Sequence, residues 1–171
     1  TAGWLHATGY AFFWEKTRRA LDRALALARE AGVPISFDPS SAGFIRRHGL
    51  DLPEGIQVLM PNRDEALALT GCSDLEDAAR QLARRAELVA VKLGPEGALL
   101  AQAVADAAVE PAVGLRSDEA AGEPAVGLRS DDAAGEMALR VQLTYVPPAV
   151  PSAPPVDGTG SGDAWGAALI D

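Results

Sequence analysis

The chain has 171 residues, of which 48% are hydrophobic and 23% are charged, and its formal net charge is −9. That balance is typical of one globular domain with a buried core, and it excludes collagen-like, disulfide-dense and wholly disordered chains. An acidic chain without a basic cluster is a poor candidate for binding nucleic acid. No apolar run approaches the roughly 18 residues that span a membrane. The single cysteine excludes an internal disulfide and favours a cytoplasmic location.

The two ends of the sequence do not resemble the ends of a domain. The chain begins with Thr1 directly before an apolar run, and it stops at Asp171 within a segment that we expect to be helical. We therefore expect residues 1–171 to be part of a longer chain.

Apolar runs alternate with segments of helical period along most of the sequence. In chain order we expect a strand at 4–8, a helix at 14–31, a strand at 35–37, a short helix at 42–48, a strand at 56–60, helices at 62–69 and 73–86, a strand at 88–91, and a hairpin of 98–101 with 141–146. We expect capping boxes at Asn62–Glu65 and Ser73–Glu76. This alternation predicts an α/β fold, a mostly parallel sheet with helices on both faces.

The carboxyl ends of parallel strands lie along one edge of a sheet, where open α/β sheets bind their ligands. Four segments follow the expected strands: Thr8-Gly9, Asp38–Ser41, Asn62–Glu65 and Lys92–Gly97. The sequence therefore predicts that these four segments form one candidate site.

A near-identical repeat lies between the two arms of the expected hairpin. Residues 110–122 recur as 123–135, and the only difference is Glu119 against Asp132. The repeat is rich in alanine, glycine and acidic residues and has no aromatic residue, which predicts a disordered surface insertion over 104–138.

The segment Asp157–Asp163 (Asp-Gly-Thr-Gly-Ser-Gly-Asp) precedes an expected helix. Glycine backbone N–H groups at a helix N-terminus form an anion site. Asp163 would then be a general base that accepts a proton from an attacking hydroxyl during phosphoryl transfer. A helix N-cap after a flexible loop explains the same spacing equally well. A dinucleotide-binding loop fits poorly, because the loop follows a proline-rich segment rather than a strand.

This segment resembles the C-terminal signature of the PfkB, or ribokinase-like, carbohydrate kinases, whose usual form is Asp-Thr-x-Gly-Ala-Gly-Asp. The sequence departs from that form at Gly158 and Ser161. The resemblance implies that Asp163 is the catalytic base and that Gly160, Ser161 and Gly162 form the anion hole for the γ-phosphate.

Two earlier segments resemble further motifs of the family. Asn62–Glu65 resembles the Asn-x-x-Glu motif, in which Asn62 would contact the nucleotide and Glu65 would hold Mg²⁺ through water. The spacing by itself favours the capping box, and the two roles are compatible. Lys92–Gly97 resembles the strand-turn motif beside the nucleotide, and the resemblance assigns nucleotide contacts to Lys92, Gly94 and Gly97. An ordinary glycine turn is the alternative for this segment.

One weaker match and one missing region complete the comparison with the family. Ser40 stands where the family's Asp-x-Asn segment has asparagine. The family's N-terminal part, with its substrate lid, has no counterpart in the sequence.

Together these features predict part of a ribokinase-like kinase domain with ATP and Mg²⁺ as cofactors and a sugar as the small-molecule substrate. A kinase of the same fold acting on a nucleoside or vitamin alcohol, and an inactive remnant, are the alternatives. We expect neither nucleic acid nor membrane as a partner, and a homodimer is conceivable only for the complete parent chain.

Overall fold

The computed structural model of the chain describes residues 2–104 and 140–148. The elements, in chain order, are β1 (Leu5–Thr8), the 3₁₀ helix η1 (Gly9–Phe13), α1 (Glu15–Glu30), β2 (Ile35–Asp38), α2 (Ala42–His48), β3 (Ile56–Leu59), α3 (Arg63–Thr70), α4 (Leu75–Leu82), β4 (Ala86–Lys92), the 3₁₀ turn η2 (Gly94–Glu96), β5 (Ala98–Val104) and β6 (Arg140–Val146). The expected insertion at 104–138 lies, apart from Val104, outside the described residues, as does the segment Asp157–Asp163.

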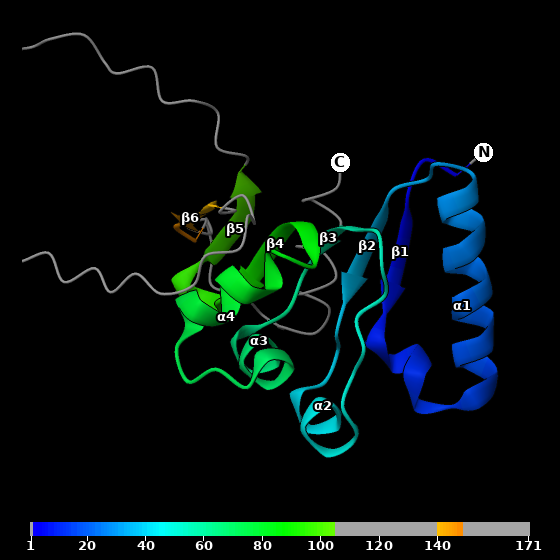
Figure 1. Cartoon of the computed structure of the whole chain (residues 1–171). Coiled ribbons are helices and arrows are strands. Elements are labelled where there is room, and N and C mark those ends of the chain that lie inside the picture. Colours follow the sequence, from blue (N-terminus) through cyan, green and yellow to red (C-terminus); the bar gives the residue numbers. More distant parts are fainter. Residues whose placement is uncertain (1, 105–139, 149–171) are drawn as a thin grey trace, which may run out of the picture.

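The strands form one six-stranded sheet in the order β1-β2-β3-β4-β5-β6 (Figure 1). Strands β1 to β4 pair in parallel, and β4, β5 and β6 pair antiparallel. The β5–β6 hairpin runs in register from Ala98 opposite Val146 to Val104 opposite Arg140. The mostly parallel sheet and the closing hairpin that the sequence predicts are both confirmed.

Helices α1, α3 and α4 pack against one face of the sheet. The larger hydrophobic cluster joins strand residues to buried residues of α1, α3 and α4, such as Leu25, Ala66 and Ala79. The smaller cluster on Val58, Met60 and Ala90 contains residues of strands and their flanks only. A parallel sheet that grows in one direction through right-handed crossovers places its helices on the same face. The expected second helical layer is therefore not among the described elements.

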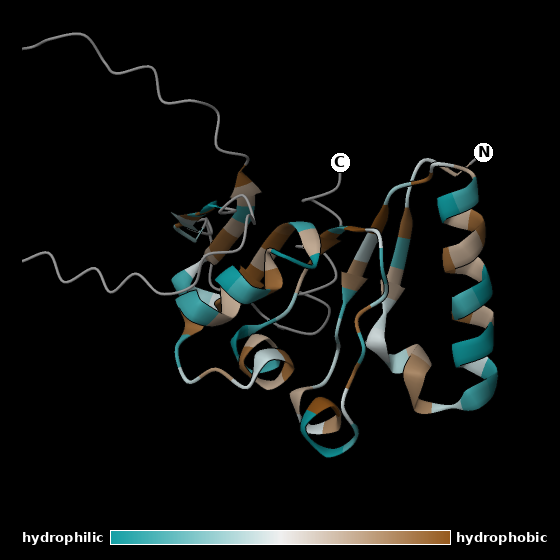
Figure 2. Cartoon of the chain, viewed as in Figure 1, coloured by the Kyte–Doolittle hydropathy of each residue, from teal (hydrophilic) through white to brown (hydrophobic). Residues whose placement is uncertain are grey.

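Figure 2 shows how hydropathy follows this arrangement, with apolar residues along the strands and alternating polar and apolar residues along α1. In α1, Leu25 and Ala28 are buried and Leu21 packs against the core, as the helical period predicts. Among the described residues, no helix is both long enough and apolar enough to cross a membrane.

Helix boundaries follow local capping chemistry. The helix α3 ends at Gly71, which has a φ of 73° and donates its N–H to the Leu67 carbonyl, as expected of a C-terminal glycine. The capping box expected at Ser73 and Glu76 is wrong. Asp74 caps α4 instead, because its carboxylate accepts the Asp77 N–H at 3.0 Å.

Candidate functional site

The carboxyl ends of β1 to β4 meet at one edge, as the sequence predicts. A Cβ added to Gly9, just after β1, would lie 2.1 Å from the Pro39 carbonyl oxygen, so these two segments are in backbone contact. Asn62 and Lys92 form an isolated parallel bridge, and the Lys92 N–H donates to the Pro61 carbonyl at 2.8 Å. All four candidate segments therefore belong to one continuous edge.

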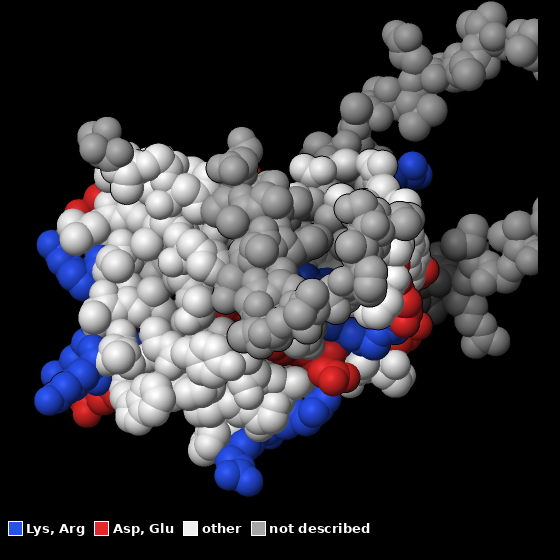
Figure 3. Space-filling model, turned by 180° about the vertical axis from the view of Figure 1, so that it is seen from behind, with Lys and Arg blue, Asp and Glu red and all other residues white. Residues whose placement is uncertain are grey.

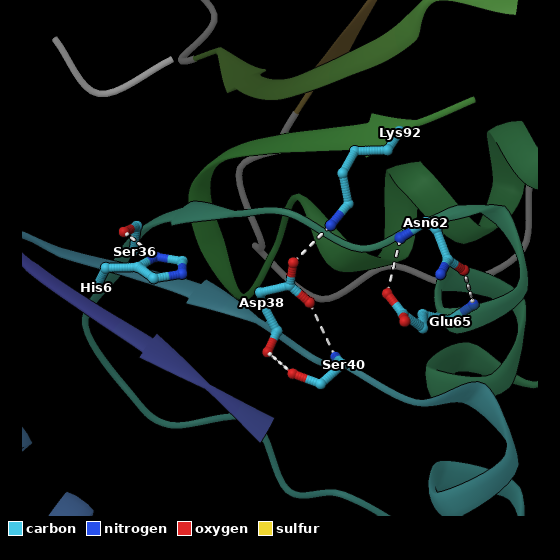
Figure 4. Close-up of polar contacts among 7 residues, drawn as sticks. All are labelled: His6, Ser36, Asp38, Ser40, Asn62, Glu65 and Lys92. Carbon is cyan, nitrogen blue, oxygen red and sulfur yellow. Dashed lines mark hydrogen bonds and ion pairs between the residues drawn. The ribbon is translucent and has the colours of Figure 1, made fainter. Parts of the chain in front are cut away.

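An ion pair crosses this edge. Lys92, the last residue of β4, points its ammonium group at Asp38, the last residue of β2, with Nζ and Oδ2 2.5 Å apart (Figure 4). The two side chains are 19% and 17% exposed, so the pair is shielded from most of the solvent. Because β3 lies between β2 and β4, the pair spans the end of the intervening strand.

The other carboxylate oxygen of Asp38 shapes the loop that follows β2. Oδ1 accepts the Ser40 N–H at 2.9 Å, and the Ser40 hydroxyl donates to the Asp38 carbonyl at 3.1 Å. Ser40 has a φ of 73°, and it is the one residue other than glycine with a positive φ among the described residues. This backbone conformation is sterically unfavourable for serine and less so for asparagine, which the family that the sequence resembles has at this position.

Asn62 and Glu65 form the capping box of α3. The Asn62 Oδ1 accepts the Glu65 N–H at 2.9 Å, and the Glu65 Oε2 accepts the Asn62 N–H at 2.8 Å. Glu65 is only 4% exposed, and this burial is the main reason that its pKa lies above the ordinary value. The nearby Asp38 charge raises the pKa further, whereas the backbone hydrogen bond from Asn62 and the charge of Lys92 lower it. The capping role of both residues is thus confirmed.

The turn after β4 depends on glycine for its shape. Gly94 and Gly97 have φ angles of 60° and 94°. A Cβ on Gly97 would lie 2.1 Å from the Val146 carbonyl oxygen, because the end of β6 passes directly over it. Within the turn, Glu96 pairs with Arg63 of α3 at 2.7 Å on the surface. Gly97 therefore has a structural function in addition to the nucleotide contact expected from the sequence.

The structure brings Asn62, Glu65 and Lys92 to one edge (Figure 4). Gly94 and Gly97 lie in the turn that follows β4. The other site residues expected from the sequence, namely Gly160, Ser161, Gly162 and Asp163, lie outside the described residues. The sequence analysis did not predict the ion pair between Asp38 and Lys92. The available signal was an acidic residue ending one parallel strand and a lysine ending another.

The carboxylates at this edge are few for binding a metal ion. The described residues hold no group of three or more histidine, cysteine, aspartate or glutamate side chains able to bind a metal. Mg²⁺, however, commonly uses one or two carboxylates and completes its shell with water and substrate phosphates. The charge of Asp38 is one cause of the raised pKa of Glu65, so the two carboxylates lie near each other at this edge. Two carboxylates match what Mg²⁺ commonly takes from a protein, but they cannot form a cage built from protein alone.

The face turned away from the view of Figure 1 shows no continuous basic surface among the described residues that are visible in Figure 3. Figure 3 shows that the visible lysine and arginine side chains form separate groups, some with acidic side chains beside them.

The family model for pfkB family carbohydrate kinases matches residues 8–116 of the chain. That range contains β2 to β5, the last residue of β1, and the four segments of the candidate edge. A comparison with curated proteins gives no match.

Several solved structures share the fold. Adenosine kinase from Sinorhizobium meliloti aligns with a TM-score of 0.65 at 21% identity, over 96% of this chain and 40% of its own. A PfkB protein from Polaromonas sp. JS666 aligns with a TM-score of 0.50 at 34% identity, over 58% of this chain and 37% of its own.

Fructokinase from Vibrio cholerae O395, solved with fructose, ADP and calcium ion bound, aligns with a TM-score of 0.51 at 28% identity, over 58% of this chain and 35% of its own. The chain thus spans well under half the length of these similar proteins.

Proposed function

Because the chain belongs to the pfkB family of carbohydrate kinases, we propose that the protein transfers the γ-phosphate of ATP to a sugar hydroxyl. The observation that carries this proposal is the gathering of Lys92, Asn62 and Glu65 at the carboxyl edge of the parallel strands. In open α/β sheets this edge is the usual place for a ligand.

The described residues divide the binding of the nucleotide between them. The Lys92 ammonium has three N–H donors, of which Asp38 takes one, and it supplies a positive charge for a phosphate oxygen. The Glu65 carboxylate is fixed by the Asn62 backbone N–H and would hold Mg²⁺ through water. Asn62 is exposed at the helix N-terminus, where its side-chain amide can donate to a phosphate.

The chemical step is assigned by resemblance to Asp163 and the loop before it, which lie outside the described residues. Asp163 would accept the proton of the attacking sugar hydroxyl. The backbone N–H groups of Gly160, Ser161 and Gly162 would stabilise charge on the transferring phosphoryl group. ATP with Mg²⁺ supplies the phosphoryl group and neutralises part of its charge.

A sugar is the preferred substrate class. The fructokinase with fructose and ADP bound is 28% identical to the aligned part of this chain, whereas the adenosine kinase is 21% identical. An identity of 21% supports a common fold and says little about the substrate. A nucleoside therefore remains the second candidate, to be separated by assaying both classes of alcohol.

Paired variants of Asn62 test the nucleotide site. Asn62→Ala removes both the helix cap and the amide, while Asn62→Ser keeps an N-cap oxygen and removes the amide alone. If Asn62 binds the nucleotide, Asn62→Ser melts like the wild type without ligand but loses most of the stabilisation by Mg²⁺ and ATP. If Asn62 is only a cap, Asn62→Ser retains that stabilisation.

Thermal unfolding with and without ATP and Mg²⁺ separates a kinase from an inactive remnant. At ATP concentrations about 100 times the Kd, binding stabilises the folded state by about 2.7 kcal/mol, a shift of several degrees. Absence of any shift would favour the remnant. In the complete protein, phosphorylation of a sugar should be lost in Asp163→Asn, and full turnover by that variant would refute the assigned base.

A further inference from the structure

The ammonium group expected to bind phosphate is already engaged. Lys92 Nζ lies 2.5 Å from Asp38 Oδ2, in a pair that is less than one-fifth exposed on either side. A carboxylate in that position cancels most of the positive charge that an incoming phosphate would meet. The described lysine at this edge is thus held in a neutralised pair, not presented as a free cation.

Asp38 is itself held in place. Its Oδ1 accepts the Ser40 N–H, and its carbonyl accepts the Ser40 hydroxyl, so the loop after β2 fixes the carboxylate. The Lys92 side chain, in contrast, is a flexible stem on the last residue of β4, beside the solvent-facing turn at Gly94. Of the two partners, the lysine is the one that can move toward a ligand.

We propose that Asp38 is a positioning residue that holds Lys92 in a closed ion pair, and that the phosphate chain of the nucleotide must draw the ammonium group away from it. This inference rests on the proposed phosphate contact of Lys92. Asp38 then weakens anion binding and keeps the lysine ordered over the end of β3 until a polyphosphate arrives.

The test uses the two lysines of the sequence. In the intact 171-residue chain labelled with ¹⁵N-lysine, ammonium NMR signals can come only from Lys16 and Lys92. Lys16 lies exposed on α1 and is an internal reference. Titration with tripolyphosphate should shift the Lys92 signal and leave the Lys16 signal unchanged. A Lys92 signal that stays fixed while tripolyphosphate binds would overturn the inference.

The Asp38→Asn variant provides the sign of the effect. The asparagine oxygen can still accept the Ser40 N–H, while the charge that holds Lys92 is removed. The ligand-free Lys92 signal should lose its protection from solvent exchange, and affinity for tripolyphosphate should rise about tenfold. Unchanged or weaker affinity would overturn the inference.

Two further variants separate the possible failures. Glu96→Gln removes a surface carboxylate from the same edge, one that pairs with Arg63, and should change the affinity less than twofold. If Glu96→Gln raises the affinity for tripolyphosphate as much as Asp38→Asn does, the effect of Asp38 is one of net charge alone, and the inference about its ion pair with Lys92 is overturned. Lys92→Met should abolish most of the binding. If it binds normally, the phosphate contact itself fails, whereas loss in Lys92→Met without a gain in Asp38→Asn overturns only the inference about Asp38.

Discussion

Replacement of Gly97 by alanine tests whether the turn after β4 is fixed by the passage of β6. The added Cβ would lie 2.1 Å from the Val146 carbonyl oxygen and 2.9 Å from backbone atoms of Pro147 and Pro148. The atoms in contact belong to the backbone, so no side chain can move aside. The end of β6 must shift by about 1 Å to restore an ordinary contact distance.

The cost of Gly97→Ala can be estimated from two terms. The φ of 94° at this position belongs to a region that is nearly closed to alanine, which costs about 1–3 kcal/mol. Displacing the end of β6 disturbs its pairing at Ala98 and Val146, and the loss of a hydrogen bond there costs about 1 kcal/mol. We therefore expect a loss of about 2–4 kcal/mol in the free energy of unfolding.

Gly71→Ala is the matched control, since Gly71 has a φ of 73° and no atom within 4 Å of an added Cβ. It should cost only the left-handed conformation, about 1 kcal/mol. The unfolded-state effect of replacing glycine by alanine is the same in both variants and cancels in the comparison. Urea unfolding monitored by circular dichroism measures both values. Equal losses would show that the contact with β6 does not constrain the turn.

Three further outcomes are expected. Ser40→Val should lower the free energy of unfolding by about 2 kcal/mol, because β-branched residues resist a φ of 73°, whereas Ser40→Asn should be neutral or stabilising. Urea unfolding of both variants checks this, and equal free energies of unfolding would contradict it. Because the folded-state pKa of Glu65 is raised, the stability that this side chain contributes is present at acidic pH and is lost as the pH rises through that pKa. The free energy of unfolding of the wild type, measured between pH 4 and 7, should therefore fall with rising pH, and this decrease should be absent in Glu65→Gln. Asp74→Ala should destabilise α4 by about 1 kcal/mol and Ser73→Ala should have little effect, and thermal unfolding that ranks them in the opposite order would contradict the assigned cap.

The mostly parallel sheet and the location of the candidate edge were predictable from the sequence because they depend on local patterns. Apolar runs such as Ile35–Phe37 alternate with segments of helical period, and this alternation predicts a parallel sheet. In a parallel sheet the carboxyl ends of the strands all lie at the same edge. The cap at Asn62 was likewise predictable, because its partner Glu65 is only three residues away.

What escaped prediction depends on contacts between distant segments. The pair of Asp38 and Lys92 joins residues 54 positions apart and requires knowing that one strand lies between them. The contact of Gly97 with Val146 depends on the path of β6 after a long intervening segment. The expectation of Ser73 instead of Asp74 as the cap was a local error: both residues favour that position, and the start of α4 at Leu75 decides between them.

The capping box and the proposed nucleotide contact are not competing explanations of Asn62 and Glu65. The cap uses Oδ1 of Asn62 and one carboxylate oxygen of Glu65, and in doing so it fixes both side chains at the edge where Lys92 ends β4. A ligand site gains from groups that are already held in place, because less conformational freedom is lost on binding. The same reasoning applies to Asp38, whose loop is fixed by Ser40. Lys92 is then the long, flexible side chain among these groups, and the position of its charge is the property that a phosphate would change.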